Sequence, residues 1–254
     1  MNLIDVIKYF ESKYPKELAY EWDNVGIQVG TLNIPAKKIL ITLDVTKDVV
    51  KETIEKKVNM IFSHHPLLFN PLDKIIFDTP RGWIIKNLIK HNITVYSAHT
   101  NYDTADGGMN DEFAKILGLK NVALMDEVDN IGRYGDIEEI HIKNFIEFIK
   151  EKLNVSSVKL IGNDDKMIKK VGISGGSGSK HMYQAKMRNC DVYLTGDVTY
   201  HTALDAESMG ITLIDIGHHA EKIFVRAVAK DLRKMFKDIE IIESEVDTNP
   251  YKNY

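Results

Sequence analysis

Residues 59–69 read NMIFSHHPLLF, and this stretch joins a short apolar run to a pair of histidines. The run 59–62 predicts a buried strand, which delivers Ser63, His64 and His65 at its carboxyl end. Neighbouring side chains at a strand end point in different directions, so each histidine could serve a different ion. The stretch therefore predicts both a sheet and a functional edge on it.

Strand and helix patterns alternate along the rest of the chain. Further strands are predicted at 38–44, 93–98, 157–161, 169–174, 191–197, 211–217 and 239–244. Helices are predicted at 3–13, about 47–57 with Thr46 as the cap, 81–91, 109–117, 143–153, from 199, and from 219 to 236. This alternation predicts an α/β fold.

The stretch 124–142 is polar, and we expect it to be irregular and to connect two domains. The first α/β domain would comprise 1–123 plus 222–254, and the second would comprise 124–221. A chain of 254 residues is long enough for two modest domains with cores of their own.

The composition indicates a cytoplasmic protein. Cys190 is the single cysteine, so an intrachain disulfide is impossible, and a reducing compartment suits the chain. We expect no signal peptide in MNLIDVIKYF and no membrane association, because no apolar run approaches the roughly 18 residues of a span. The net charge of -4 gives no global basic field of the kind that non-specific nucleic-acid binders show.

Histidines gather at the predicted strand ends. Six of the nine lie there: His64, His65, His99, His201, His218 and His219. Ligands of open α/β sheets bind outside the carboxyl ends of the strands, where the loops converge. Asp103 and Glu221 follow close behind two of these histidines. Imidazole with carboxylate suits Zn, Fe, Mn, Co or Ni better than Ca. A lone strand-end histidine is more often a hydrogen-bonded structural residue, so both interpretations stay open here.

Six motifs resemble one family in their order along the chain. They are WDNVGIQVG (22–30), SHHPLLF (63–69), SAHTNYD (97–103), GISGGSGS (172–179), LTGDVTYH (194–201) and GHHAEK (217–222). The chain resembles the GTP cyclohydrolase 1 type 2 homologue family, also called Ngg-interacting-factor-three-like. The resemblance implies two α/β domains with a metal-binding cleft between them, two divalent transition-metal ions per subunit, and a ring-shaped homohexamer.

The resemblance also implies the metal ligands. His64 and His65 match the paired histidine ligands of the family, Asp103 matches a carboxylate ligand, and His218 matches the late histidine ligand. His99 matches a near neighbour of the site. The family usually has a bridging Glu four residues after the late histidine, where this chain has Lys222. Glu221, three residues after His218, is expected to take that role, because both spacings return to one helix face.

Three further motifs have two interpretations each. The glycine cluster 172–178 could cradle phosphate or could be a turn that allows close backbone approach. Asp197 is expected to cap the helix that contains His201, with His201 in the core or next to the site rather than in direct catalysis. Trp22-Asp23-Asn24 resembles the early loop of the family, although Asp-Asn before Gly26 is also ordinary turn chemistry.

The leading hypothesis is a dinuclear metal-dependent hydrolase that acts on a nucleotide-like or phosphate-containing substrate. His64, His65, Asp103, His218 and Glu221 would hold the ions, and His99 or His201 would move protons. The family name implies GTP ring opening, but no sequence feature identifies guanine recognition. The alternative is a metal-containing ring-shaped binding protein that engages DNA, other nucleic acid or protein partners without turnover. The lysine-bearing segments 85–90 and 166–170 favour that alternative.

Overall fold

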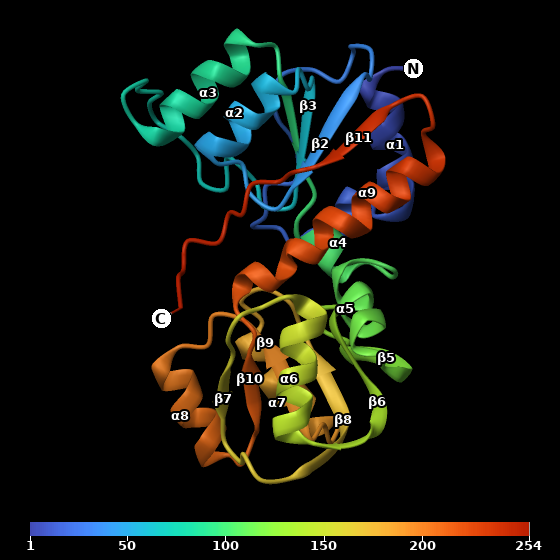
Figure 1. Ribbon diagram of the computed structural model, residues 1–254, viewed down its shortest axis with the longest axis vertical. Helices are drawn as coiled ribbons and strands as arrows, with labels where there is room; N and C mark the ends of the chain where they lie inside the picture. Colours follow the sequence, from blue (N-terminus) through green and yellow to red (C-terminus); the bar gives the residue numbers. More distant parts are fainter. Residues whose placement is uncertain (254) are drawn as a thin grey trace. The chain divides into compact units, whose positions relative to one another are not determined.

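The computed structural model describes residues 1–253, which form two compact units (Figure 1). Unit 1 comprises Met1–Ala105 and Phe224–Pro250, and unit 2 comprises Asp106–Ile223 and the C-terminal residues from Tyr251. Each unit has one sheet with helices packed on it, which confirms the predicted α/β fold class. The domain boundaries at 123/124 and 221/222 stay predictions. No helix within the described residues is long and apolar enough to cross a membrane.

The sheet of unit 1 has five strands in the order β1-β4-β3-β2-β11. They are β1 (Gly26–Val29), β2 (Lys38–Thr42), β3 (Met60–Ser63), β4 (Thr94–Ser97) and β11 (Glu240–Glu243). β1 is antiparallel to β4, and all other neighbouring pairs are parallel. The segments that follow β2, β3 and β4 therefore meet at one edge of the sheet.

Helices cover both faces of this sheet, as Figure 1 shows. They are α1 (Leu3–Lys13), α2 (Lys47–Glu55), α3 (Pro80–Lys90) and α9 (Ile223–Met235), with the short α4 (Thr100–Thr104) and the 3-10 helix η1 (Lys16–Leu18) beside them. Phe62 of β3 packs on Phe10 of α1, with ring centroids 4.7 Å apart. Ile61, its neighbour in the strand, points to the opposite face and packs in a cluster with Val49 of α2 and Leu88 of α3. Burial on both faces explains why the strands are almost continuously apolar.

The sheet of unit 2 has six strands in the order β5-β6-β8-β9-β10-β7. They are β5 (Lys120–Asp126), β6 (Ile131–His141), β7 (Lys159–Ile161), β8 (Met167–Ile173), β9 (Val192–Thr195) and β10 (Leu213–Asp215). The helices are α5 (Met109–Leu117), α6 (Ile142–Leu153), α7 (Met182–Met187) and α8 (Tyr200–Ser208), with 3-10 helices η2 (Ser179–His181) and η3 (His218–Lys222). β8, β9 and β10 are parallel, so the segments that follow these three strands also meet at one sheet edge.

The expectation that 124–142 is irregular was wrong. Most of this stretch belongs to β5 and β6, which pair as an antiparallel hairpin at the edge of the sheet. Asn130 and Gly132 turn the chain with positive φ angles of 50° and 75°. The outer half of β6 is partly exposed, so its polar side chains face water and break the apolar run that marks a buried strand.

A buried hydrogen bond between a carboxylate and a histidine ties this hairpin to η2. His181 Nδ1 lies 2.7 Å from Asp126 Oδ2, and both side chains are 3% exposed. Burial opposes ionisation of Asp126, but hydrogen bonds from His181 and from the backbone N–H groups of Val128 and Asp129 lower its pKa below the usual value. The carboxylate of Asp126 therefore stabilises the fold above its unfolded pKa of about 3.9, and this contribution disappears as the pH falls through the lower, folded pKa. Burial lowers the pKa of His181, so its ring is neutral at neutral pH.

We expect Asp126→Ala to lower the free energy of unfolding by about 3 kcal/mol, because it leaves His181 buried without its carboxylate. Urea denaturation at neutral pH measures this loss. Asp165→Ala is the control: it removes an exposed carboxylate that lies 3.1 Å from Nε2 of His141, and it should cost less than about 1 kcal/mol. Equal losses in the two variants would contradict the assignment.

Candidate metal centre

Three histidines of unit 1 converge at the edge formed by β3 and β4. His64 and His65 follow β3, and His99 follows β4. The ring centroids lie 5.0 Å apart for His64 and His65, 5.2 Å for His64 and His99, and 5.6 Å for His65 and His99. One nitrogen from each ring lies within 4.8 Å of one nitrogen from each of the others, a spacing that a metal ion could bridge.

Each of these rings is held through its Nδ1 atom by an oxygen. The oxygens are the carbonyl of Ala98 at 2.8 Å from His64, Oδ1 of Asp44 at 2.6 Å from His65, and Oδ1 of Asp23 at 3.0 Å from His99. An Nδ1–H that donates to oxygen leaves the Nε2 lone pair of the neutral ring as the ligand atom. This is the arrangement in which proteins orient metal-binding histidines.

Asp103 adds a carboxylate from α4 to the same group. Its Oδ1 lies 3.5 Å from Nε2 of His64, and the His64 side chain is fully buried. Because Nδ1 of His64 is used as a donor, its neutral ring directs a lone pair toward the carboxylate. Two electron-rich atoms approach each other this closely at low energy when a cation or a proton lies between them. The donor chemistry and the geometry therefore fit a divalent metal ion.

Asp23 was predicted only as part of the early loop Trp22-Asp23-Asn24 or of a turn, and not as a partner of a histidine. Its carboxylate accepts hydrogen bonds from His99 Nδ1, from the Thr100 backbone N–H at 3.0 Å and from the Thr100 hydroxyl at 2.6 Å. Burial raises the pKa of Asp23, but these hydrogen bonds outweigh it and bring the pKa to about 2. The carboxylate is thus ionised at neutral pH and can stabilise positive charge on His99. Asp23 lies 76 positions before His99, so no local spacing could reveal the contact.

The second ligand group lies in unit 2, after β10. His218 and Glu221 belong to η3, and Nε2 of His218 lies 3.2 Å from Oε2 of Glu221, which is 3% exposed. A 3-10 helix has three residues per turn, so position +3 lies directly above the first residue. The turn type thus accounts for the spacing of three. Lys222 extends elsewhere and donates to the carbonyl oxygen of Asn154 at 2.7 Å.

The prediction that Asp197 caps a helix was wrong. Thr199 caps α8, and its hydroxyl accepts from the Thr202 N–H at 3.3 Å. Asp197 has a positive φ of 53°, and its Oδ2 binds Nδ1 of His218 at 2.6 Å and the hydroxyl of Ser177 at 2.7 Å. Burial raises the pKa of Asp197, but the hydrogen bonds from His218 and Ser177 lower it by more, so the pKa lies below its usual value. Asp197 therefore orients His218 as Asp44 orients His65.

His201 lies outside this group of contacts. It is exposed on α8, and its ring packs against Tyr200 with centroids 5.5 Å apart. The interpretation of His201 as a core residue was wrong, because Ala206 is the buried residue of α8 and His201 is exposed. Its assignment as a proton carrier stays a prediction.

The glycine cluster makes room for Glu221. A Cβ on Gly175 would lie 3.0 Å from Oε1 of Glu221, and a Cβ on Gly176 would lie 2.8 Å from it. Gly196 is equally crowded, since its Cβ would meet the backbone of His218 at 2.8 Å. The close-approach interpretation of the cluster is therefore the one that the geometry supports, with a carboxylate side chain as the approaching group.

The chain is similar to known proteins along nearly its whole length. A family model described as Duf34/NIF3 (NGG1p interacting factor 3) matches residues 1–250. The chain belongs to the Duf34/NIF3 family. The resemblance predicted from the six motifs is thereby confirmed.

Relatives and solved structures of the Duf34/NIF3 family match along the whole chain. A GTP cyclohydrolase 1 type 2 homolog of Lactococcus lactis is 37% identical, over 99% of each sequence. The crystal structure of a Bacillus cereus protein related to NIF3 has a TM-score of 0.95 at 29% identity, covering 100% of this chain and 99% of that one. Protein SA1388 of Staphylococcus aureus has a TM-score of 0.93 at 30% identity, with the same coverage.

The Duf34/NIF3 chain thus carries a group of candidate metal ligands of mixed imidazole and carboxylate character after β3 and β4 in unit 1, and another after β10 in unit 2. Such donors suit first-row transition metals, and the oxygen acceptors behind each ring raise its basicity as a ligand. The two groups arise in the same way, from loops at the carboxyl ends of parallel strands.

We expect Gly176→Ala to destabilise this Duf34/NIF3 protein more than Gly210→Ala does. Both glycines have positive φ angles, 58° and 66°, so an alanine at either position is strained and destabilises the folded protein by roughly 1–2 kcal/mol. Only the methyl group at 176 meets Glu221, which adds an overpacking cost of about 1–3 kcal/mol, while the space around Gly210 is open within 4 Å. Urea denaturation of the two variants gives the difference, and a difference of zero would show that Glu221 does not need this space.

Proposed function

We propose that this protein is a cytoplasmic metal-dependent hydrolase with a dinuclear centre, acting on a nucleotide-like or phosphate-containing substrate. In this proposal His64, His65, Asp103, His218 and Glu221 hold two divalent transition-metal ions. The assignment of both ligand groups to one pair of ions rests on the family resemblance. The cytoplasmic location rests on the single cysteine and on the composition of the chain.

One observation carries the proposal. His64, His65, His99 and His218 all have Nδ1 bonded to an oxygen acceptor, and each can present Nε2 as a ligand atom. Structural histidines need one satisfied nitrogen each, and nothing in packing requires four of them to share this orientation beside carboxylates. Ligand orientation for metal binding does require it.

Bound divalent ions supply Lewis acidity to a substrate oxygen and make water a stronger acid near neutral pH. The residues of the chain do the rest. The carboxylates of Asp103 and Glu221 offset the positive charge that is brought into a buried site. His99 can take up and return a proton at Nε2, because the ionised carboxylate of Asp23 stabilises its charged ring through Nδ1. His201 is the second candidate for proton transfer, from its exposed position on α8.

The substrate class follows from the chemistry of such a site. Phosphate oxygens are hard anionic ligands that two cations can hold and polarise. Relatives carry the name GTP cyclohydrolase 1 type 2 homolog, so GTP belongs in the substrate screen together with other nucleotides and simple phosphoesters. The proposal also includes the ring-shaped homohexamer that the resemblance implies, which sedimentation velocity would detect.

Elemental analysis should find two metal equivalents per chain after reconstitution. Glu221→Gln should lose at least one of them, because an amide is a weaker ligand and carries no charge to offset the cations. Lys222→Ala is the matched control next to it in the sequence, and it should keep both, since Lys222 binds the Asn154 carbonyl. Retention of two metals with unchanged affinity in Glu221→Gln would show that the bridging carboxylate comes from elsewhere.

Hydrolysis should depend on the ligands and not on the fold alone. We expect His65→Ala and Asp103→Asn to abolish metal-dependent hydrolysis while the far-UV circular dichroism spectrum stays native. His91→Ala changes an exposed histidine at the end of α3 and should retain full activity. If the metal-loaded wild type hydrolyses no nucleotide or phosphoester, the result favours the alternative of a metal-containing binding protein. A salt-dependent affinity for DNA would then support that alternative.

A further inference from the structure

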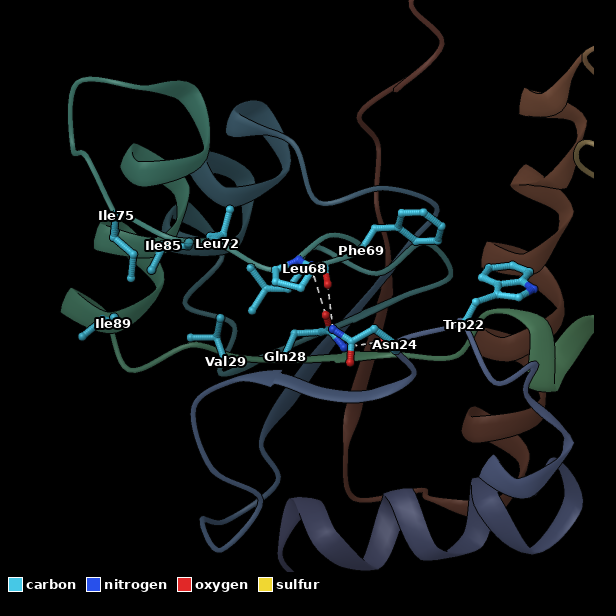
Figure 2. A pocket seen from close by; sticks show the side chains of 11 residues that line it. Trp22, Asn24, Gln28, Val29, Leu68, Phe69, Leu72, Ile75, Ile85 and Ile89 are labelled. Carbon is cyan, nitrogen blue, oxygen red and sulfur yellow. Dashed lines mark hydrogen bonds between the residues drawn. The ribbon is translucent and has the colours of Figure 1, made fainter.

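An apolar pocket of about 680 Å³ lies within unit 1, beside β1 (Figure 2). Its walls come from β1 and the residues before it, from the segment that follows SHHP, and from α3. None of the residues that line it carries a charge. A pocket of this size and character is typical of sites for small organic molecules, which bury most of their surface in such a space.

The pocket has an aromatic end and an aliphatic end, which Figure 2 shows apart from each other. Trp22 and Phe69 form the aromatic end, with ring centroids 5.9 Å apart at 65°. Ile75 and Ile89 lie at the other end. The rings are large apolar surfaces left open to water, since Trp22 is 58% and Phe69 is 44% exposed. A ligand ring inserted there would recover the burial that these side chains lack.

The middle of the pocket is held in place by amide side chains. Asn24 Nδ2 donates to the carbonyl oxygen of Leu68 at 2.6 Å, and Gln28 Oε1 accepts from the Leu68 N–H at 3.1 Å. Gln28 Nε2 donates to the carbonyl oxygen of Asn24 at 2.7 Å. These bonds tie the segment around Leu68 to β1, so the walls are formed before a ligand arrives.

The aromatic end adjoins the histidine group. The ring of His99 lies 6.2 Å from the ring of Trp22 and 6.2 Å from that of Phe69. The aromatic end is also linked to His99 through the chain, because Trp22 directly precedes Asp23, whose carboxylate binds Nδ1 of His99. A molecule with a ring between Trp22 and Phe69 would therefore have its next few atoms beside His99, whose ring lies 5.2 Å from that of His64 and 5.6 Å from that of His65.

We propose that this pocket binds the uncharged, apolar part of the substrate, with a flat aromatic ring at Trp22 and Phe69. This inference rests on the proposed function and narrows it to phosphate esters of apolar aromatic groups. Polar rings such as nucleobases fit less well, because most of the lining is apolar and because Asn24 Nδ2 and Gln28 Oε1 already bind the backbone of Leu68. The phosphate would then lie toward His99 and its neighbours.

The first test uses binding without metal or turnover. Isothermal titration calorimetry in the presence of EDTA should show 2-naphthol binding to the wild type, with about tenfold weaker binding to Trp22→Ala and Phe69→Ala, the effect of losing one ring contact together with its buried area. Phe77→Ala is the matched control, since Phe77 belongs to the same segment and is 53% exposed but lies outside the pocket. Equal affinity in all variants, or no binding to the wild type, would overturn the inference.

The second test separates this inference from the proposed hydrolase. With metal-loaded protein, Phe69→Ala should lower the ratio of kcat/KM for 2-naphthyl phosphate to kcat/KM for methyl phosphate about tenfold, whereas Phe77→Ala, outside the pocket, should keep the wild-type ratio. Binding of 2-naphthol without hydrolysis of either ester would support the pocket and overturn the hydrolase. Hydrolysis of both esters with the same kcat/KM ratio in the wild type, Phe69→Ala and Phe77→Ala would overturn the pocket alone.

The same variants test a competing occupant. If a second copy of the chain covers the aromatic end, Trp22→Ala and Phe69→Ala will lower the sedimentation coefficient and Phe77→Ala will not. That result would overturn the inference, because the groove would then be an interface between copies. An unchanged sedimentation coefficient together with weaker naphthol binding supports the small-molecule site.

Discussion

The register between β3 and β4 is the constraint on which the histidine group of unit 1 depends. The two strands are parallel, and Ser63 pairs with Ser97. The residues that follow each of them, His64 and Ala98, are therefore neighbours across the strand ends, and the ring of one reaches the carbonyl oxygen of the other. A shift of one residue would turn His64 to the opposite side of the sheet and would separate it from Asp103.

Burying His64 and Asp103 together costs free energy, because both side chains lose contact with water. A fully buried imidazole and a nearly buried carboxylate share a small space, and each requires compensation for the water it has lost. In unit 2 two glycines, Gly175 and Gly176, have no side chains and so leave the room that the Glu221 carboxylate occupies. Both units thus place charged groups where packing alone would favour apolar ones, as functional sites commonly do.

The sequence predicted those parts of the fold and site that depend on local pattern. Buried parallel strands are continuously apolar, so β2, β3 and β4 and the histidines at their ends could be found by reading along the chain. The β5-β6 hairpin was missed because its outer face is polar. Asp23, Asp44 and Asp197 were missed as histidine partners because each lies at least 21 positions from the ring that it holds. The sequence also could not predict that His218 begins a 3-10 turn, because residues three and four positions apart lie on the same face of an ordinary α-helix.

The order of the strands has a consequence for the biosynthesis of the chain. β11 completes the unit 1 sheet by pairing with β2, yet nearly 200 residues separate these two strands in the sequence, and all of unit 2 up to Ile223 is translated between them. As the nascent chain leaves the ribosome, β2 remains a bare edge with unsatisfied backbone groups until the last residues emerge. The unfinished sheet is therefore a natural target for chaperones, and a ribosome that stalls before Glu240 would release a product prone to aggregation.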